Sequence, residues 1–319
     1  MAECVKGSPE ILVLGYNAWD VHLPTGAVAE RDAKYEVSHI AYTGGGPGAT
    51  ASFALVRLGA QVKLATQLGD DLPGRLQHEE LSAIGVDLSL SRINPGFETP
   101  KAVILVDPRS GERTIFWTRG DLPPLSPDLV DYSWLDNMDL FYTDGHETAA
   151  ARKLALEAKR RGLPVVMDAG SVRTGSVDLV AAVTDAISSE GFAPAMTGNE
   201  NPAEALRALH QMGPERVAMT FGARGVLALE SGVVVHIPAF KVRVVDTTGA
   251  GDAFHAGYAF ARATGRNFTE SLTFGSAVAG LKCEDWGGRA GLPELSEVEA
   301  LVQEGQRQPL DAELAPLLG

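Results

Sequence analysis

The chain of 319 residues has few cysteines, few cations and no long apolar run. Its two cysteines, Cys4 and Cys283, lie far apart without the spacing of a zinc site, so we expect reduced thiols and no disulfide framework. No apolar run approaches the roughly 20 residues that a membrane-spanning helix needs, and the first ten residues contain no apolar core of a signal peptide. We therefore expect a cytoplasmic protein without a membrane partner.

Positive charge is scarce in this chain. Lys and Arg together number 27 against 41 Asp and Glu, which gives a formal net charge of −14. Such a chain repels the phosphate backbone of nucleic acids and anionic membrane surfaces, so neither is an expected partner. An anionic small molecule would have to be held by local basic groups, because the field of the whole protein opposes it.

The order of the apolar segments predicts an α/β fold. After residue 140, short buried strands alternate with helices, which is typical of a doubly wound, mostly parallel sheet with helices on both faces. The expected strands are 11–15, 61–66, 101–107, 112–118, 140–143, 165–168, 186–189, 216–220, 226–230, 233–237 and 241–245. The expected helices are 49–58, one ending at 84, 148–161, 253–263, 269–283 and 294–302.

Two segments depart from this alternation. Residues 101–107 and 112–118 alternate in apolar character around a Pro-Arg-Ser-Gly turn, which predicts a β-hairpin. Residues 21–42 look extended and irregular. We expect both segments to form a small sheet beside the main one, so that the chain is one domain, 1–319, with an appendage at about 17–43 and 99–119. Because a small sheet needs a cover for its second face, an oligomer is also expected.

The most informative stretch is 241–263, KVRVVDTTGAGDAFHAGYAFARA. It predicts a strand, a turn of small residues and then a helix. A glycine-rich turn before a helix leaves free amides at the positive end of the helix dipole, and such a site binds anions, phosphate above all. Asp252 lies beside that anion site. It could simply favour the start of the helix, but a carboxylate there can also accept a proton from a hydroxyl that attacks a phosphoryl group.

The sequence DTTGAGD before a small, aromatic-rich helix resembles the C-terminal signature of the ribokinase-like (PfkB) carbohydrate kinases. The resemblance implies transfer of phosphate from ATP, with Mg²⁺ bridging the nucleotide phosphates, to a hydroxyl of a small sugar. It implies that Asp252 is the catalytic base and that the amides of Gly249, Ala250 and Gly251 form the anion hole for the transferring phosphoryl group.

A second stretch, from Gly44 to Gly74, resembles the N-terminal signature of the same family. The resemblance implies that Asp20 and the backbone of Gly45 and Gly46 hold sugar hydroxyls. The resemblance also shows a difference, because some relatives bind sugar hydroxyls with two Asn after the Gly pair. Pro47 and Thr50 occupy those positions in this chain, and we keep Thr50 as a candidate substrate-binding residue. The family also implies that the small sheet is a lid over the sugar and often the contact of a homodimer.

The nucleotide side follows from the resemblance as well. Three residues match the pattern T-x-G-x-x-G of the family, and two fall where relatives wall the adenine pocket: Thr220, Gly222, Gly225, Phe240 and Cys283. Phe240 and Cys283 could equally be core residues, because both residue types favour interiors.

Metal ions are implied at two further places. Asp246 and Thr248 match positions where many members bind a monovalent cation such as K⁺. The N-x-x-E motif of the family, tied to Mg²⁺ and phosphate, is replaced here by Ser189-Glu190-Gly191-Phe192, and Glu190 could substitute for its carboxylate.

Within the family, the chain resembles the ketohexokinase and sulfofructose kinase branch over Gly44–Ala51, Pro238–His255 and Ala279–Pro293. A ketose or a furanose-form sugar is therefore the expected substrate class. The alternatives are a nucleoside kinase, a sugar- or nucleotide-binding sensor without catalysis, and an NAD-dependent oxidoreductase. The last lacks its fingerprint, because only Gly15 follows the first strand where G-x-G-x-x-G would be needed.

Overall fold

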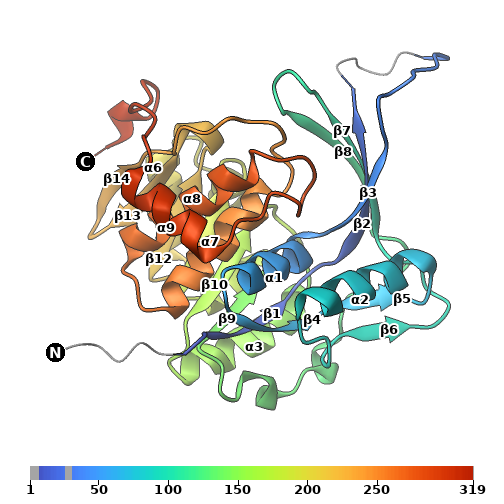
Figure 1. The fold of residues 1–319 in the computed structure, drawn as a ribbon. Coiled ribbons are helices and arrows are strands. Elements are labelled where there is room, and N and C mark those ends of the chain that lie inside the picture. Colours follow the sequence, from blue (N-terminus) through green and yellow to red (C-terminus); the bar gives the residue numbers. More distant parts are fainter. Residues whose placement is uncertain (1–6, 26–30, 319) are drawn as a thin grey trace.

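The computed structural model describes residues 7–25 and 31–318 (Figure 1). Cys4 and residues 26–30 of the expected appendage lie outside the described residues. Within the described ranges, no helix combines the length and the apolar character that crossing a membrane would require.

The strands are, in chain order, β1 (Glu10–Leu14), β2 (Ala18–Pro24), β3 (Ala41–Gly45), β4 (Gln61–Ala65), β5 (Gln67–Gly69), β6 (Arg92–Asn94), β7 (Lys101–Val106), β8 (Arg113–Thr118), β9 (Leu140–Thr143), β10 (Val165–Ala169), β11 (Asp185–Ser189), β12 (Arg216–Thr220), β13 (Val226–Glu230) and β14 (Val233–Ile237). The helices are α1 (Pro47–Arg57), α2 (Leu72–Ile84), α3 (Thr148–Arg160), α4 (Ser176–Ala182), α5 (Phe192–Thr197), α6 (Pro202–Gln211), α7 (Ala250–Ala263), α8 (Phe268–Lys282) and α9 (Leu295–Glu304).

The main sheet has eight strands in the order β14-β13-β12-β11-β10-β9-β1-β4. The six from β4 to β12 run parallel, and the hairpin of β13 and β14 adds two antiparallel strands at one edge. Since the carboxyl ends of parallel strands meet at one edge of a sheet, the loops after β1, β9 and β10 come together there.

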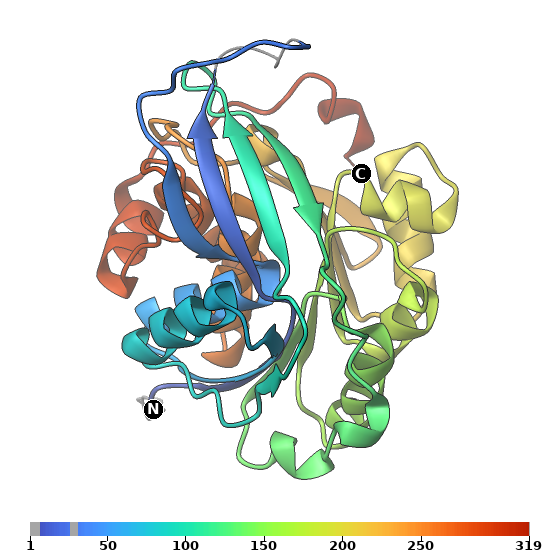
Figure 2. The ribbon, with the colours of Figure 1, turned by 90° about the vertical axis from the view of Figure 1, so that its right-hand side faces the viewer.

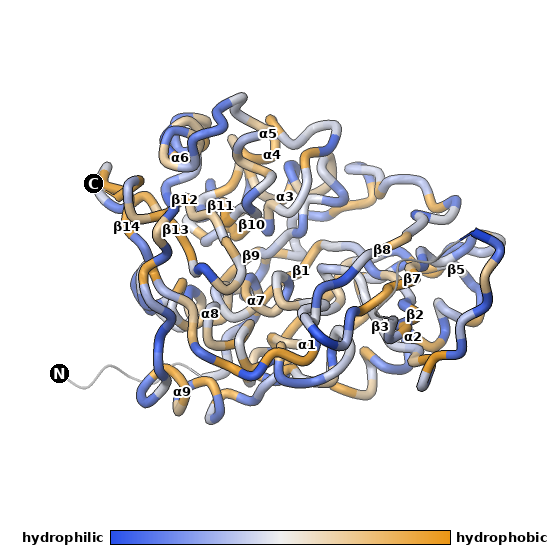
Figure 3. Tube along the Cα trace, turned by 90° about the horizontal axis from the view of Figure 1, so that it is seen from above, coloured by the Kyte–Doolittle hydropathy of each residue, from blue (hydrophilic) through white to orange (hydrophobic). Residues whose placement is uncertain are grey.

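Two hydrophobic cores cover the two faces of this sheet. Alternate residues of β1 point to opposite faces: Ile11 and Val13 pack with helices α1, α7, α8 and α9, whereas Leu12 and Leu14 pack with α3 to α6. Figure 3 shows the two groups of helices on either side of the sheet. This arrangement confirms the expected doubly wound α/β fold.

A separate four-stranded sheet has the order β3-β2-β7-β8 and projects from the main body (Figures 1 and 2). The hairpin of β7 and β8 was expected, but residues 21–42 are not simply irregular, because β2 and β3 are regular strands. The sequence of β2 lacks the usual alternation of buried apolar and exposed polar residues, because its buried side chains include the polar residues Asp20 and His22. A third, two-stranded sheet, β5-β6, was also unexpected.

The expected strand at 241–245 is wrong. This segment has no strand partner and runs irregularly between β14 and α7. Its amides bond to neighbouring loops, with Lys241 donating to the carbonyl of Gln306 and Val245 to that of Cys283, both at 2.8 Å. The β-branched run favours extended backbone, but its amides bond to loop carbonyls rather than to a neighbouring strand.

Candidate active site

A cavity of about 290 Å³ lies where the carboxyl edge of the main sheet meets the small sheet. It is lined by residues of β2, β7 and β8, by the loops after β1, β9 and β10, and by the N-terminus of α7. These residues are Tyr16, Ala18, Asp20, Gly46, Pro47, Lys101, Ala102, Ile104, Arg113, Ile115, Trp117, His146, Ser171, Arg173, Thr248, Gly249, Gly251 and Asp252.

The N-terminus of α7 presents free amides to this cavity. Gly249 is the N-cap with φ 75°, a conformation that glycine adopts without strain. Among the described residues, no protein acceptor bonds to the amides of Gly249, Gly251 and Asp252, whereas the amide of Ala250 donates to the carbonyl of Thr247 at 3.2 Å. Of the three amides expected from the sequence, the two glycine amides are therefore free and that of Ala250 is engaged.

Asp252 stands in the first turn of α7 in the cavity wall. Burial raises the pKa of its carboxyl to about 7, and the nearby Asp168 raises that pKa further. A carboxyl whose pKa lies near neutral is suited to accept a proton in this pH range.

The sugar-side candidates come from the start of the small sheet. Asp20 on β2 faces the cavity, and burial raises the pKa of its carboxyl to about 7, although the neighbouring Arg289 lowers that pKa. Gly46 also lines the cavity, and a Cβ at Gly45 would collide with the Asp20 carboxylate. Thr50 is buried in α1 and does not reach the cavity wall.

Asp144, which no pattern singled out, fixes three segments of the site. Its Oδ2 atom accepts the amide of Tyr16 at 2.6 Å and that of Gly48 at 2.8 Å, and Oδ1 accepts the amide of His146 at 3.0 Å. One buried carboxylate thus joins the loop after β1, the start of α1 and the loop after β9. Its position directly after β9 was a usable signal, because ligand sites gather beyond the carboxyl ends of strands.

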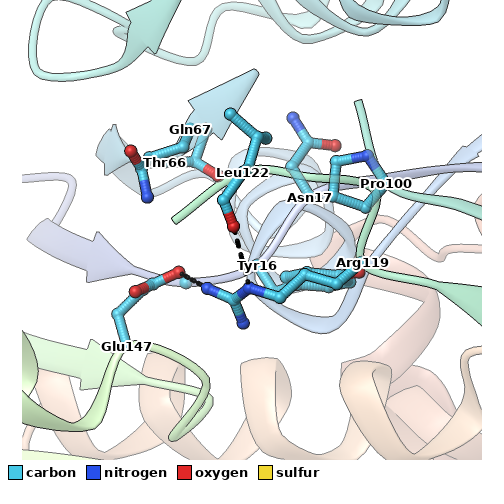
Figure 4. Close-up of a pocket in the computed structure, with 9 residues that line it drawn as sticks. Tyr16, Asn17, Thr66, Gln67, Pro100, Arg119, Leu122 and Glu147 are labelled. Atoms are coloured by element: carbon cyan, nitrogen blue, oxygen red, sulfur yellow. Dashed lines mark hydrogen bonds and ion pairs between the residues drawn. The ribbon is translucent and has the colours of Figure 1, made fainter. Parts of the chain in front are cut away.

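A small void of about 10 Å³ lies behind this wall (Figure 4). Arg119 is ion-paired with Glu147 at 2.5 Å and lies over the ring of Tyr16, with 5.8 Å between the guanidinium carbon and the ring centroid. Tyr16 in turn stacks on His146 at 4.2 Å between ring centroids. This stack holds two side chains of the cavity wall in place.

None of the five nucleotide-side residues lines the cavity itself. The Thr220 hydroxyl at the end of β12 donates to the Ser188 carbonyl at 3.3 Å, and Gly222 and Gly225 have φ of 57° and 95° in the turn that follows. Phe240 and Cys283 are buried. The Arg307 guanidinium covers the ring of Phe240 at 3.4 Å from the centroid.

The candidate metal ligands are engaged with protein groups. Glu190 is ion-paired with Arg224 at 2.6 Å. The two carboxylate oxygens of Asp246 accept the amides of Thr248 and Gly287, each at 2.8 Å, and its carbonyl accepts the buried ammonium of Lys282 at 2.9 Å. No group of three or more His, Cys, Asp or Glu in the described ranges could hold a metal ion.

A mostly parallel sheet covered on both faces carries free amides at a helix N-terminus and a buried carboxyl at one cavity, an arrangement that suits group transfer. The model of the pfkB family of carbohydrate kinases matches residues 8–295. The chain belongs to this family and is a phosphotransferase with an alcohol group as acceptor.

Individual relatives agree with this assignment. The ribokinase of Haemophilus influenzae is 29% identical over 266 residues, which cover 81% of this chain and 86% of the relative. The ATP-dependent ribose-1-phosphate kinase of Halopiger xanaduensis is 29% identical over 303 residues, or 92% and 98% of the two chains. The structure of Arabidopsis thaliana ribokinase complexed with ribose and ATP has a TM-score of 0.79 at 25% identity and covers 93% of this chain and 99% of that one.

Proposed function

We propose that this chain transfers the γ-phosphoryl group of ATP to a hydroxyl of a small sugar, with Asp252 as the general base. The observation that carries the proposal is the meeting of Asp252, the free amides of Gly249 and Gly251, and Asp20 at one cavity. A base, an anion hole and a second carboxylate that can accept sugar hydroxyls are the groups that this reaction needs.

In the proposed reaction, Asp252 takes the proton of the attacking hydroxyl on its carboxylate. The amides of Gly249 and Gly251, with that of Asp252 in place of Ala250, hold the oxygens of the transferring phosphoryl group. Mg²⁺ supplies charge neutralisation between the nucleotide phosphates when it is bound. Because Mg²⁺ is commonly held by phosphates, water and only one or two carboxylates, we assign it no protein ligand beyond the candidate Glu190.

For the acceptor we favour a ketose or a furanose-form sugar, in keeping with the resemblance to the ketohexokinase branch. The named relatives act on ribose and ribose 1-phosphate, which extends the range to test. Release of ADP with ATP and Mg²⁺ across sugars, sugar phosphates, sugar acids and nucleosides tests the proposal. Preference for nucleosides would favour a nucleoside kinase, and ATP binding without turnover on any acceptor would favour a sensor.

Dependence on a monovalent cation is a further part of the proposal. Thr248 has a buried hydroxyl without a partner in the described part of the chain, which supports an oxygen ligand at this place. Asp246 supports it less, because its oxygens are already engaged. Equal activity in potassium and tetramethylammonium salts would remove the cation from the proposal.

The anion hole predicts a loss of activity in Gly251→Ala. A Cβ at Gly251 meets no atom within 4 Å, so the fold should tolerate the methyl group. The methyl would enter the space proposed for the phosphoryl group, and we expect kcat/KM to fall about 10²-fold, as for loss of an oxyanion-hole donor. The matched control is Gly7→Ala, where a Cβ is equally free of contacts and which is not among the residues that line the cavity. Equal activities of the two variants would remove Gly251 from the anion hole.

We also propose that the small sheet acts as a lid and as the contact of a homodimer. Tyr42, Val21, Val103 and Phe116 are aligned across its four strands on the face away from the cavity. Tyr42 and Phe116 are 64% and 61% exposed, an unusual exposure for large apolar side chains.

The dimer proposal predicts that Phe116→Glu dissociates the protein into single chains, because a charge buried in an apolar contact is costly. Light scattering after size exclusion should give twice the mass of one chain for the unaltered protein and the mass of one chain for the variant. Val177→Glu changes an exposed valine elsewhere and should keep the dimer. A monomeric unaltered protein would contradict the proposal.

A further inference from the structure

Arg173 is a cavity-lining cation that lacks a carboxylate partner. No Asp or Glu of the described chain lies within ion-pairing distance of its guanidinium, although it lines the cavity that holds Asp252. Three arginines at buried or half-buried places are paired with carboxylates, Arg119 with Glu147, Arg289 with Glu80 and Arg262 with Asp185, whereas the half-buried Arg307 donates to the Pro238 carbonyl and covers the ring of Phe240. A half-buried cation without a counter-charge is costly, so a missing anionic partner is the simplest reason for its presence.

The neighbour of Arg173 does not supply that charge. Its Nη2 atom lies 2.6 Å from Nε2 of His146. Burial lowers the pKa of His146 to about 4, with smaller contributions from Asp144, Arg173 and Arg119, so the ring is neutral at pH 7. A neutral ring accepts a hydrogen bond and orients the guanidinium, but it leaves the positive charge in place. The amide of Arg173 also donates to the Ser176 hydroxyl at 2.9 Å, which anchors the loop.

Arg173 contacts the sugar side of the cavity through its neighbour His146, which stacks on Tyr16 of the loop after β1 at 4.2 Å between ring centroids. Arg173 follows β10, and His146 follows β9, which lies between β10 and β1. The sugar-side residue Asp20 lies on β2, the strand that follows β1, whereas the nucleotide-side turn follows β12 and none of its candidate residues lines the cavity. At the anion turn a different cation, Arg113 of β8, donates to the Thr247 hydroxyl at 3.1 Å and also lines the cavity. Arg113 can therefore serve the transferring phosphoryl group, and Arg173 remains for the acceptor.

We propose that Arg173 binds an anionic substituent, a carboxylate or a phosphate, on the sugar that this enzyme phosphorylates. This inference rests on the proposed kinase function and names the substrate class of the same site. A guanidinium presents parallel N–H donors that match an oxyanion, and the hydroxyl of Ser171 lines the same cavity. The Tyr16 hydroxyl, whose pKa burial raises well above its usual value, is engaged elsewhere, because it donates to the carbonyl of Thr118 at 3.4 Å.

Two features of the sequence support recognition of the sugar through a negative charge that it carries. Pro47 and Thr50 stand where relatives use two amides to read hydroxyls, and Thr50 does not reach the cavity. The net charge of −14 gives no general attraction for anions, so an acidic sugar needs a local cation.

The test compares matched acceptors on the unaltered enzyme. ADP release is measured with ribose, ribose 1-phosphate and ribose 5-phosphate, with fructose and its monophosphates, and with a hexonic acid against its neutral aldose. We expect kcat/KM to be about 10- to 150-fold higher for an anionic member than for its neutral partner, the range for a hydrogen bond to a charged group. A sugar acid as the preferred acceptor would identify a carboxylate, and a sugar phosphate would identify a phosphate.

The variant Arg173→Met should reduce that anionic-to-neutral ratio at least about tenfold, and Arg173→Lys should restore part of it, because a charge without the planar fork remains. In Arg113→Met we expect kcat/KM to fall equally for the anionic and the neutral acceptor, so the ratio between them should not change. Calorimetric binding of the preferred acceptor without ATP gives a readout that does not need turnover. Equal use of neutral and anionic sugars by the unaltered enzyme would overturn the role of Arg173 and leave the kinase proposal intact, whereas ADP release from no acceptor would count against the kinase proposal itself.

Discussion

The variant Asp252→Asn should lose about 10²- to 10⁴-fold in kcat while it still binds ATP, because an amide cannot take the proton of the attacking hydroxyl. Asn keeps the size of the side chain and its place in the first turn of α7. Single-turnover assays with the best acceptor measure the loss, and nucleotide titration measures ATP binding. Turnover near that of the unaltered enzyme would remove Asp252 as the base.

The same carboxyl should determine the acid limb of the pH profile. Its pKa is raised to about 7, chiefly by burial, so kcat/KM should fall as the pH decreases below about 7 and the base becomes protonated. Asp20, with a pKa also raised to about 7, should steepen this limb, and the two groups titrate as a pair. A profile that stays flat down to pH 5 would contradict both assignments.

Stability should separate a catalytic loss from misfolding in Asp252→Asn. An acid whose pKa is raised on folding binds its proton more tightly in the folded state. Its contribution to stability is therefore greatest below the pKa of the unfolded chain and is lost as the pH rises through about 7. At pH 8 the charged Asp252 is a cost that Asn removes, so the melting temperature of the variant should be equal or higher.

Asp168→Asn provides the matched control. This buried carboxyl lies 3.3 Å from His255, and burial together with Asp144 raises its pKa to about 8. It is largely protonated at pH 7, so Asn is a close substitute and the loss of kcat should be far smaller than in Asp252→Asn. Because Asp168 is already mostly protonated below pH 7, the acid limb of the variant should stay close to its original pH.

The fold and the centre of the candidate site were predictable because their signals are local. Strands such as β1 and β10 are uninterrupted apolar runs, and the turn before α7 carries its glycines and Asp252 in consecutive positions. The strand expected at 241–245 failed for the opposite reason. Its β-branched residues satisfy a local preference, but whether a strand forms depends on pairing with another strand, which no local pattern reports.

The residues that complete the site were not predictable from patterns. Asp144 accepts hydrogen bonds from three backbone amides, which belong to segments far apart in the chain. Arg173 is notable because no carboxylate of the described chain is ion-paired with it. The role of β2 was hidden because Asp20 and His22 occupy its buried positions, which inverts the usual alternation. Tertiary contacts decide such positions, and a single sequence records only their residue types.

Arg289 is another residue whose role only the tertiary contacts show. The variant Arg289→Met should lower the free energy of unfolding by about 3 kcal/mol or more, in the range for breaking a buried ion pair. Its side chain is buried and joins the loop after α8 to the sugar side of the cavity. It donates to the Gly45 carbonyl at 3.0 Å, to Gln77 at 3.2 Å and to Glu80 at 2.9 Å. Met fills a similar volume but leaves these acceptors without their donor. Urea unfolding with an unchanged m-value measures the loss.

The matched control is Arg57→Met. Arg57 is paired with Glu294 at 3.3 Å near the surface, with both side chains partly exposed, so its loss should cost only about 0–1 kcal/mol. If the two variants lose equal stability, the Arg289 contacts are not the fixed link that the structure shows.

Arg289→Met should also weaken sugar binding beyond its effect on stability. The Arg289 guanidinium is the main group that lowers the pKa of Asp20 against the effect of burial. Without it, that pKa should rise above about 7, and Asp20 should be mostly protonated at neutral pH. A protonated carboxyl accepts hydroxyl donors poorly, so KM for the sugar should rise at pH 7 and recover in part at pH 9, whereas a purely structural loss would not recover with pH. The stability of the site and its affinity for sugar would thus depend on one buried guanidinium, to which the sequence alone assigned no role.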